Sequence, residues 1–199
     1  MPIRTTMLTC LLAAIVFTAG CGPAAPKPDP EPSGPVVTID TSMGVIRAEL
    51  WSDRAPITVK NFLAYVEAKH FDGLIFHRVM QGFMIQGGGF DLAMIEKPTL
   101  AEIKNEATPD KKNDRGTLAM ARTGVVDSAT SQFYINLVDN AGLNQRDKTV
   151  EGFGYCAFGK VISGMDVVDK IAAVPVGFVA GHANVPTVPV IIKSIRLAE

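Results

Sequence analysis

The sequence lacks a charge bias. Its 19 basic and 20 acidic residues give a formal net charge of −1 at pH 7, and no run of like charge is longer than two residues. A nucleic-acid-binding domain normally carries a basic patch or stripe, so we expect no nucleic-acid partner. With 47% hydrophobic and 20% charged residues, the chain has the composition of a globular protein rather than a disordered one.

Cysteine is scarce. The three cysteines are Cys10 and Cys21 near the N-terminus and Cys156, which stands alone in the rest of the chain. A single thiol cannot form an internal disulfide, which excludes a disulfide-stapled scaffold. Cys156 lies in the apolar run 155–158, so we interpret it as a small core residue rather than a nucleophile.

The apolar run near the N-terminus is short. Residues 7–17 follow Arg4 and fall below the roughly 20 residues that a membrane-spanning helix needs, as is typical of a signal peptide. Small residues then precede Cys21, and this ending resembles the lipobox of bacterial lipoproteins, in which the cysteine is lipidated after cleavage. We therefore predict a signal peptide over 1–20 and lipidation of Cys21. A plain secretory signal cut at Gly20, or an uncleaved anchor, is the alternative.

A proline-rich segment follows this cysteine. Alternating prolines in residues 22–35 favour an extended polyproline II chain over a packed element. At ~3.1 Å per residue, this segment would hold a domain roughly 40 Å from its anchor. We expect 21–35 to be a lipidated tether and 36–199 a single domain in the cell envelope. The lipid would keep this domain at a membrane, facing the periplasm or the exterior.

From Val36 onward the sequence shows many short strand patterns. Apolar residues at helical spacing predict a helix over 56–69, with Pro56 in its first turn, and a second helix after Gly164. Short strands accompanied by two helices favour a β-barrel whose ends the helices cover. The predicted strands are 36–39, 45–50, 75–79, 83–86, 117–121, 132–137, 155–161 and 190–197.

Residues 76–90, Phe-His-Arg-Val-Met-Gln-Gly-Phe-Met-Ile-Gln-Gly-Gly-Gly-Phe, form the most informative segment. They read as a strand pair that carries one arginine and one glutamine beside Phe83 and Met84. Regular alternation would place Phe76 and Arg78 on one face of the first strand. A few polar groups beside apolar side chains are typical of a ligand pocket.

This segment resembles the central signature of the cyclophilins. Segments 116–121, 131–136 and 155–168 agree with other motifs of that family, and the resemblance extends from about Val36 to Leu197, with features of the bacterial branch. It implies an all-β fold, a closed eight-stranded antiparallel β-barrel capped by two α-helices. It also implies peptidyl-prolyl cis/trans isomerase activity on proline-containing polypeptides, here in protein folding outside the cytoplasm.

The resemblance also implies roles for individual residues. Arg78 matches the catalytic arginine, and Gln86 matches the glutamine that binds the substrate backbone. The residues implied to bind the substrate are His77, Phe83, Met84, Gln86, Ala121, Arg122, Gln132, Tyr134, Leu143 and Tyr155. Taken singly, Arg78 could instead be a surface ion-pair partner, and the apolar residues could be plain core.

Rotation about a peptide bond makes and breaks no covalent bond, so we expect no cofactor, metal or nucleophile. A zinc site built from His70, His77 and His182 lacks compact ligand spacing. We expect a monomer. Two other functions stay open: a module that binds proline-containing segments without catalysis, and a structural envelope lipoprotein.

The sequence departs from the family pattern at two positions. Tyr134 stands where phenylalanine is usual, and we expect its hydroxyl at the pocket rim. Gly142 stands where an aromatic residue often precedes the leucine, and the single tryptophan, Trp51, lies elsewhere. The missing aromatic wall predicts weak cyclosporin binding.

Overall fold

The computed structural model describes Met1 and residues 32–198. The predicted signal peptide, Cys21 and most of the predicted tether lie outside the described residues, so those interpretations stay predictions. Within the described part of the chain, no helix has the length and apolar character needed to cross a membrane.

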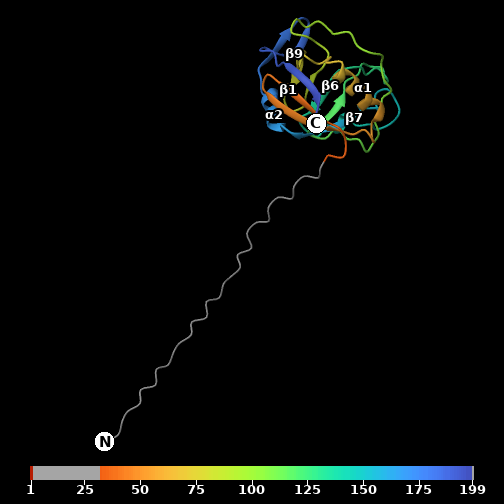
Figure 1. The fold of residues 1–199 in the computed structure, drawn as a ribbon. Helices are drawn as coiled ribbons and strands as arrows, with labels where there is room; N and C mark the ends of the chain where they lie inside the picture. The colour runs from red at the N-terminus through yellow and green to blue at the C-terminus, as the bar shows by residue number, and fades with distance from the viewer. Residues whose placement is uncertain (2–31, 199) are drawn as a thin grey trace. The chain divides into compact units, whose positions relative to one another are not determined.

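The chain forms mainly strands, with one helix after the first two strands and a second helix near the C-terminus (Figure 1). The helices are α1 (Pro56–Glu67) and α2 (Met165–Ala172), and a 3-10 turn, η1, covers Ala141–Leu143. The strands of the large sheet are β1 (Val36–Thr41), β2 (Gly44–Leu50), β3 (Arg78–Met80), β4 (Met84–Gly87), β5 (Thr117–Met120), β6 (Phe133–Asn136), β7 (Ala157–Ser163) and β10 (Ile192–Leu197).

Each of the eight predicted strands overlaps a strand of the large sheet, although β3 contains only residues 78 and 79 of the predicted 75–79. All pairings in this sheet are antiparallel, in the order β10-β1-β2-β7-β5-β6-β4-β3. The closed barrel is not confirmed, since the sheet is a curled half-barrel with β3 and β10 at its ends. Ahead of β3, Ile75 and Ile191 form an isolated bridge, and backbone hydrogen bonds join residues 73, 74 and 76 to residues 190 and 192. The ladder stops there because β3 is short and the chain at 76–77 is not in strand conformation.

Alternation along β6 shows how one strand serves both faces of the sheet. Phe133 and Ile135 point into the main core, whereas Tyr134 joins a second, smaller apolar cluster on the opposite face. All four residues of β6 are buried because both faces are covered. This explains why β5 and β6 lack the alternation of apolar and polar residues that a half-exposed strand shows.

Aromatic side chains fill the main core between α1 and the sheet. Phe62 of α1 is fully buried, and its ring centroid lies 5.4 Å from that of Phe133 in β6 and 5.2 Å from that of Phe158 in β7. Such tilted and edge-to-face pairs add to the free energy gained by burying the rings. Cys156 is 3% exposed, so its interpretation as a core residue is confirmed.

A two-stranded sheet of β8 (Val176–Val179) and β9 (His182–Pro186) follows α2, where the sequence pattern predicts no strand. Its turn carries Ala180 and Gly181, both with positive φ, as a tight hairpin turn requires. In Figure 1 this hairpin lies at the blue end of the colour scale, beside the large sheet.

Candidate active site

The register of three strands brings the predicted polar residues into one row. Arg78 of β3 lies opposite Gln86 of β4, and Gln86 lies opposite Tyr134 of β6. Residues directly opposite in antiparallel strands share one face of the sheet, so these three side chains stand side by side. Phe76 lies in the core on the other face and is fully buried, so placing it on the face of Arg78 is wrong; the break at 76–77 interrupts the alternation.

A pocket of about 150 Å³ opens beside this row. Its apolar floor is the second cluster, in which Met84, Ala119 and Tyr134 are buried and Phe83 and Leu143 are partly buried. The pocket is lined by Arg78, Phe83, Met84, Gln86, Ala121, Arg122, Tyr134, Leu143 and Tyr155. Every one of these residues carries a role implied by the resemblance, and the structure brings them together from five separate stretches of the chain.

Two polar side chains of the row, Arg78 and Gln86, are joined by a hydrogen bond, and a second hydrogen bond links Gln86 to Gln132. Arg78 Nη1 donates to Gln86 Oε1 over 3.4 Å, and Gln86 Nε2 donates to Gln132 Oε1 over 2.9 Å. Arg78 is exposed, and none of the ion pairs within the described residues includes it. The surface ion-pair interpretation of Arg78 therefore finds no partner, and its charge is available to a ligand in the pocket.

His77 lies beside this pocket rather than in it. The imidazole is 5% exposed, packs 4.6 Å from the ring of Phe90, and borders a neighbouring hollow together with Gln132. Burial, and then the charge of His182, lower the pKa of His77 to about 4. His77 is therefore neutral at neutral pH. Within the described residues, no three potential metal-ligating side chains gather at one point.

The hydroxyl of Tyr134 is not at the pocket rim, so that expectation is wrong. The residue is 4% exposed, and its Oη donates a 2.8 Å hydrogen bond to Asn113 Oδ1. Burial raises the pKa of Tyr134 well above its usual value. Asn113 Nδ2 in turn donates to the carbonyl oxygens of Leu143 and Tyr155, each over 3.2 Å. Asn113 thus ties three walls of the pocket together, and the sequence pattern does not identify it.

Arg122 holds the loop that carries one wall of the pocket. Its guanidinium donates to the carbonyl oxygens of Thr123, Val150 and Gly154 over 2.9–3.1 Å. The same guanidinium carbon lies 4.8 Å from the ring centroid of Tyr155. Its N–H groups are therefore largely engaged within the protein, which favours a supporting role.

Gly142, one residue before the pocket residue Leu143, has open space beside it. A Cβ at this position would meet no atom within 4 Å, so the position has space for a larger side chain. Trp51 does not line the pocket, but it packs against the apolar cluster beneath it. Its ring also lies 4.5 Å from the guanidinium carbon of Arg54. The tryptophan is thus closer to the site than its place in the sequence suggests.

The candidate site is thus an arginine at the rim of a small pocket on a curled antiparallel sheet. Residues 36–197 match the model of the family described as cyclophilin type peptidyl-prolyl cis-trans isomerase/CLD. The chain belongs to this family. Its activity is therefore peptidyl-prolyl cis/trans isomerisation.

Proteins similar to this chain over most of its length are peptidyl-prolyl cis-trans isomerases. The chain is 53% identical over 161 residues to a peptidyl-prolyl cis-trans isomerase of Streptomyces antibioticus, covering 81% of this chain and 97% of that protein. It is 51% identical over 164 residues to peptidyl-prolyl cis-trans isomerase B of Escherichia coli, covering 82% and 100%. A crystal structure of a Cryptosporidium parvum cyclophilin, in the presence of the dipeptide Ala-Pro, has a TM-score of 0.67 at 29% identity and covers 82% of this chain and 99% of that one.

Proposed function

We propose that this isomerase accelerates slow folding steps of proline-containing proteins outside the cytoplasm, held at a membrane by lipid on Cys21. The observation that carries the catalytic part is the exposed guanidinium of Arg78 at the rim of the 150 Å³ pocket. Uncatalysed rotation of a prolyl bond takes tens to hundreds of seconds, long enough to limit folding. The clients are polypeptides with accessible Xaa-Pro bonds.

The proposed mechanism uses electrostatics rather than covalent chemistry. Twisting the prolyl bond breaks the conjugation that gives it a barrier of about 18–20 kcal/mol, and the lone pair returns to the nitrogen. Arg78 would donate hydrogen bonds to that nitrogen and to the substrate carbonyl. Because the nitrogen accepts a hydrogen bond only when the bond is twisted, this interaction is stronger in the transition state than in either ground state.

The pocket and Gln86 would divide the substrate into a fixed and a rotating part. The apolar side chains of Phe83, Met84 and Leu143 suit a proline ring, which has no hydrogen-bonding group. Gln86 stands next to Arg78, with its amide already oriented by the bonds to Arg78 and Gln132. It would hold the substrate backbone while the other side of the prolyl bond turns.

The test of catalysis is the rate of prolyl isomerisation in an Ala-Pro peptide. We expect Arg78→Ala to lower kcat/KM by about 10²–10³, the usual cost of removing one such hydrogen-bond donor. Stability should change by less than about 0.5 kcal/mol, because Arg78 is exposed. Unchanged turnover would refute the role of Arg78. Binding of the peptide without acceleration by the wild type would identify a binding module instead.

The proposed anchor rests on the sequence alone: an apolar segment over 7–17, small residues before Cys21, and the proline-rich tether. The wild-type chain expressed in a bacterium should carry acyl chains on Cys21, detectable by mass spectrometry, and should sediment with membranes. Cys21→Ser should abolish both. A soluble, unmodified wild-type chain would refute the anchor but leave the isomerase activity standing.

A further inference from the structure

A second hollow lies next to the proline pocket and shares Arg78 and Gln86 with it. Its volume is about 470 Å³, roughly three times that of the proline pocket. Its far wall comes from β9, where His182 and Asn184 line it. Isomerisation of a bare Xaa-Pro bond does not require this space.

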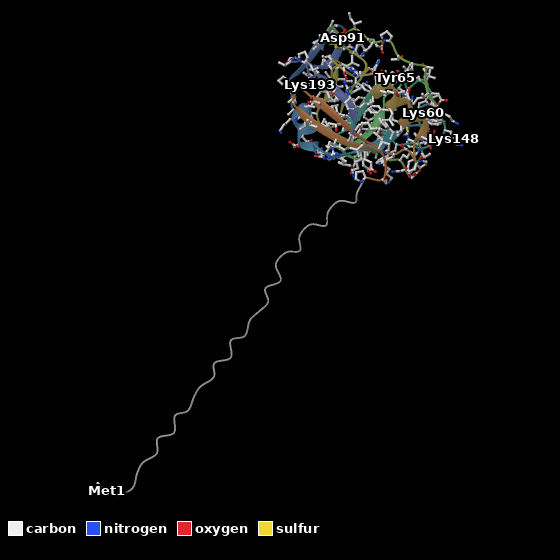
Figure 2. The ribbon with its side chains drawn as sticks, in the orientation of Figure 1. Met1, Lys60, Tyr65, Asp91, Lys148 and Lys193 are labelled. Atoms are coloured by element: carbon white, nitrogen blue, oxygen red, sulfur yellow. The ribbon has the colours of Figure 1, made fainter. Side chains whose placement is uncertain are left out.

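Tilted and edge-on ring contacts join the large sheet to the β8–β9 hairpin. The ring of Phe90 lies 4.6 Å from His77 on one side and 5.2 Å from His182 on the other. The loop after Phe90 is fixed by Asp91, whose carboxylate accepts hydrogen bonds from the N–H groups of Ala93 and Ile95, each over 2.9 Å. Figure 2 labels Asp91 near the outer edge of the domain. The wall is therefore formed before a ligand binds.

The β9 side of the hollow includes a residue with an unusual backbone conformation. Asn184 has φ of 62°, a left-handed conformation that asparagine tolerates better than most residues. His182 is exposed, and Gly181 and Ala183 beside it are too small to fill the space. The hairpin thus presents an imidazole and an amide to an open, roomy site.

The hollow is lined by hydrogen-bond donors and by a fixed positive charge. Arg78 supplies a positive charge, and the side chains of His182 and Asn184 can donate hydrogen bonds. No acidic residue is among the residues that line it. Glu96, which accepts a 3.3 Å hydrogen bond from Gln132 Nε2, lines a different hollow. The chemistry that fits these donors is a carboxylate.

We propose that this hollow is a subsite that selects substrates with an acidic side chain near the proline, with His182 and Asn184 as its specificity residues. This inference rests on the proposed function of Arg78 and Gln86. An extended chain advances about 3.3–3.6 Å per residue, so sharing these two residues places the acidic side chain within one or two positions of the proline. A contact made equally in the ground and transition states lowers KM and leaves kcat unchanged.

The experiment uses the full chain and peptides with one central proline that differ only in Glu, Gln or Lys at each of the two positions before and after that proline. At one of these positions we expect KM for the Glu peptide to be about twofold to fivefold below that for Lys, as for other exposed ion pairs. The difference should shrink at high salt, because salt screens exposed charges. Peptide binding, followed by fluorescence anisotropy, measures the same preference without relying on turnover.

A negative charge added at the hollow tests whether the preference for Glu peptides arises there. His182→Glu should reverse the preference, so that Lys binds better than Glu, and Asn184→Gly should weaken it while keeping the left-handed backbone. The matched control is Val188→Glu, which adds the same charge at a residue that is 75% exposed and does not line the hollow. The control should keep the wild-type preference.

The outcomes separate the subsite from the isomerase. Equal KM and equal binding for Glu, Gln and Lys in the wild type would overturn the subsite while leaving the isomerase intact. Equal shifts in His182→Glu and Val188→Glu would also overturn it, since the effect would then be one of overall charge. Failure to accelerate any peptide would refute the proposed function, and anisotropy would still decide whether the hollow prefers a carboxylate.

Discussion

Removing the hydroxyl of Tyr134 should destabilise the domain, while the aromatic ring continues to line the proline pocket. In Tyr134→Phe the ring keeps its place in the cluster with Met84 and Ala119. Asn113 Oδ1, however, loses its 2.8 Å hydrogen bond and keeps only a 3.4 Å contact from Asn136 Nδ2. Both asparagines are fully buried, so bulk water cannot replace the lost donor.

The size of the expected loss in stability follows because the contact from Asn136 replaces the hydrogen bond from Tyr134 only in part. A buried neutral hydrogen bond contributes about 0.5–1.5 kcal/mol, and stranding a buried acceptor costs about 1–3 kcal/mol. We therefore expect the free energy of unfolding to fall by about 1–2 kcal/mol, with the melting temperature falling by about 2–4 °C for each kcal/mol. Denaturant unfolding should show a lower midpoint with an unchanged slope.

Tyr155→Phe is the matched control, because it makes the same chemical change in a partly exposed ring of the same pocket. It should change stability by less than about 0.5 kcal/mol. A Tyr134→Phe protein as stable as the wild type would refute the conclusion that the Asn113 network holds the pocket together.

The remaining predictions concern three other residues. The folded-state pKa of His77, about 4, lies below its ordinary 6.5, so its contribution to stability is full above pH 6.5 and is lost as the pH falls towards 4. The loss is about 3 kcal/mol at most, and His77→Gln should flatten this part of the stability–pH curve; an equally steep curve would contradict the assignment. Gly142→Trp, at a position with open space, should tighten cyclosporin binding in a fluorescence titration, and a wild type that already binds at nanomolar concentration would refute the predicted weakness. Arg122→Ala should speed amide hydrogen exchange over residues 150–154, and unchanged protection there would show that its three backbone hydrogen bonds do not hold the loop.

The sequence predicts the large sheet well because its strands bury β-forming residues on at least one face. It misses the β8–β9 hairpin for a physical reason. Val176 and Phe178 are 41% and 75% exposed, so no alternation of apolar and polar residues marks β8. The turn is Ala180-Gly181 rather than the Asn-Gly or Asp-Gly that signals a tight hairpin, and prolines occupy both flanks.

Some residues of the candidate site can also be predicted from the sequence, whereas others cannot. Arg78, Gln86 and Tyr134 lie in sequence motifs that resemble those of the family, and strand register places them side by side. Asn113 lies on a loop without periodicity, and its importance depends on contacts with Leu143 and Tyr155, which are distant in sequence. Only the folded chain shows such a buried amide.

The place of β1 in the sheet has a mechanical consequence. Val37 lies opposite both Ala48 of β2 and Leu197 of β10, so β1 is hydrogen-bonded on two sides. A force applied along the chain ahead of β1 must shear both ladders at once, instead of unzipping a single edge. β3 and β4, which carry Arg78 and Gln86, lie at the opposite end of the strand order. A load on the chain ahead of β1 would therefore meet two ladders before it reaches the strands that carry Arg78 and Gln86.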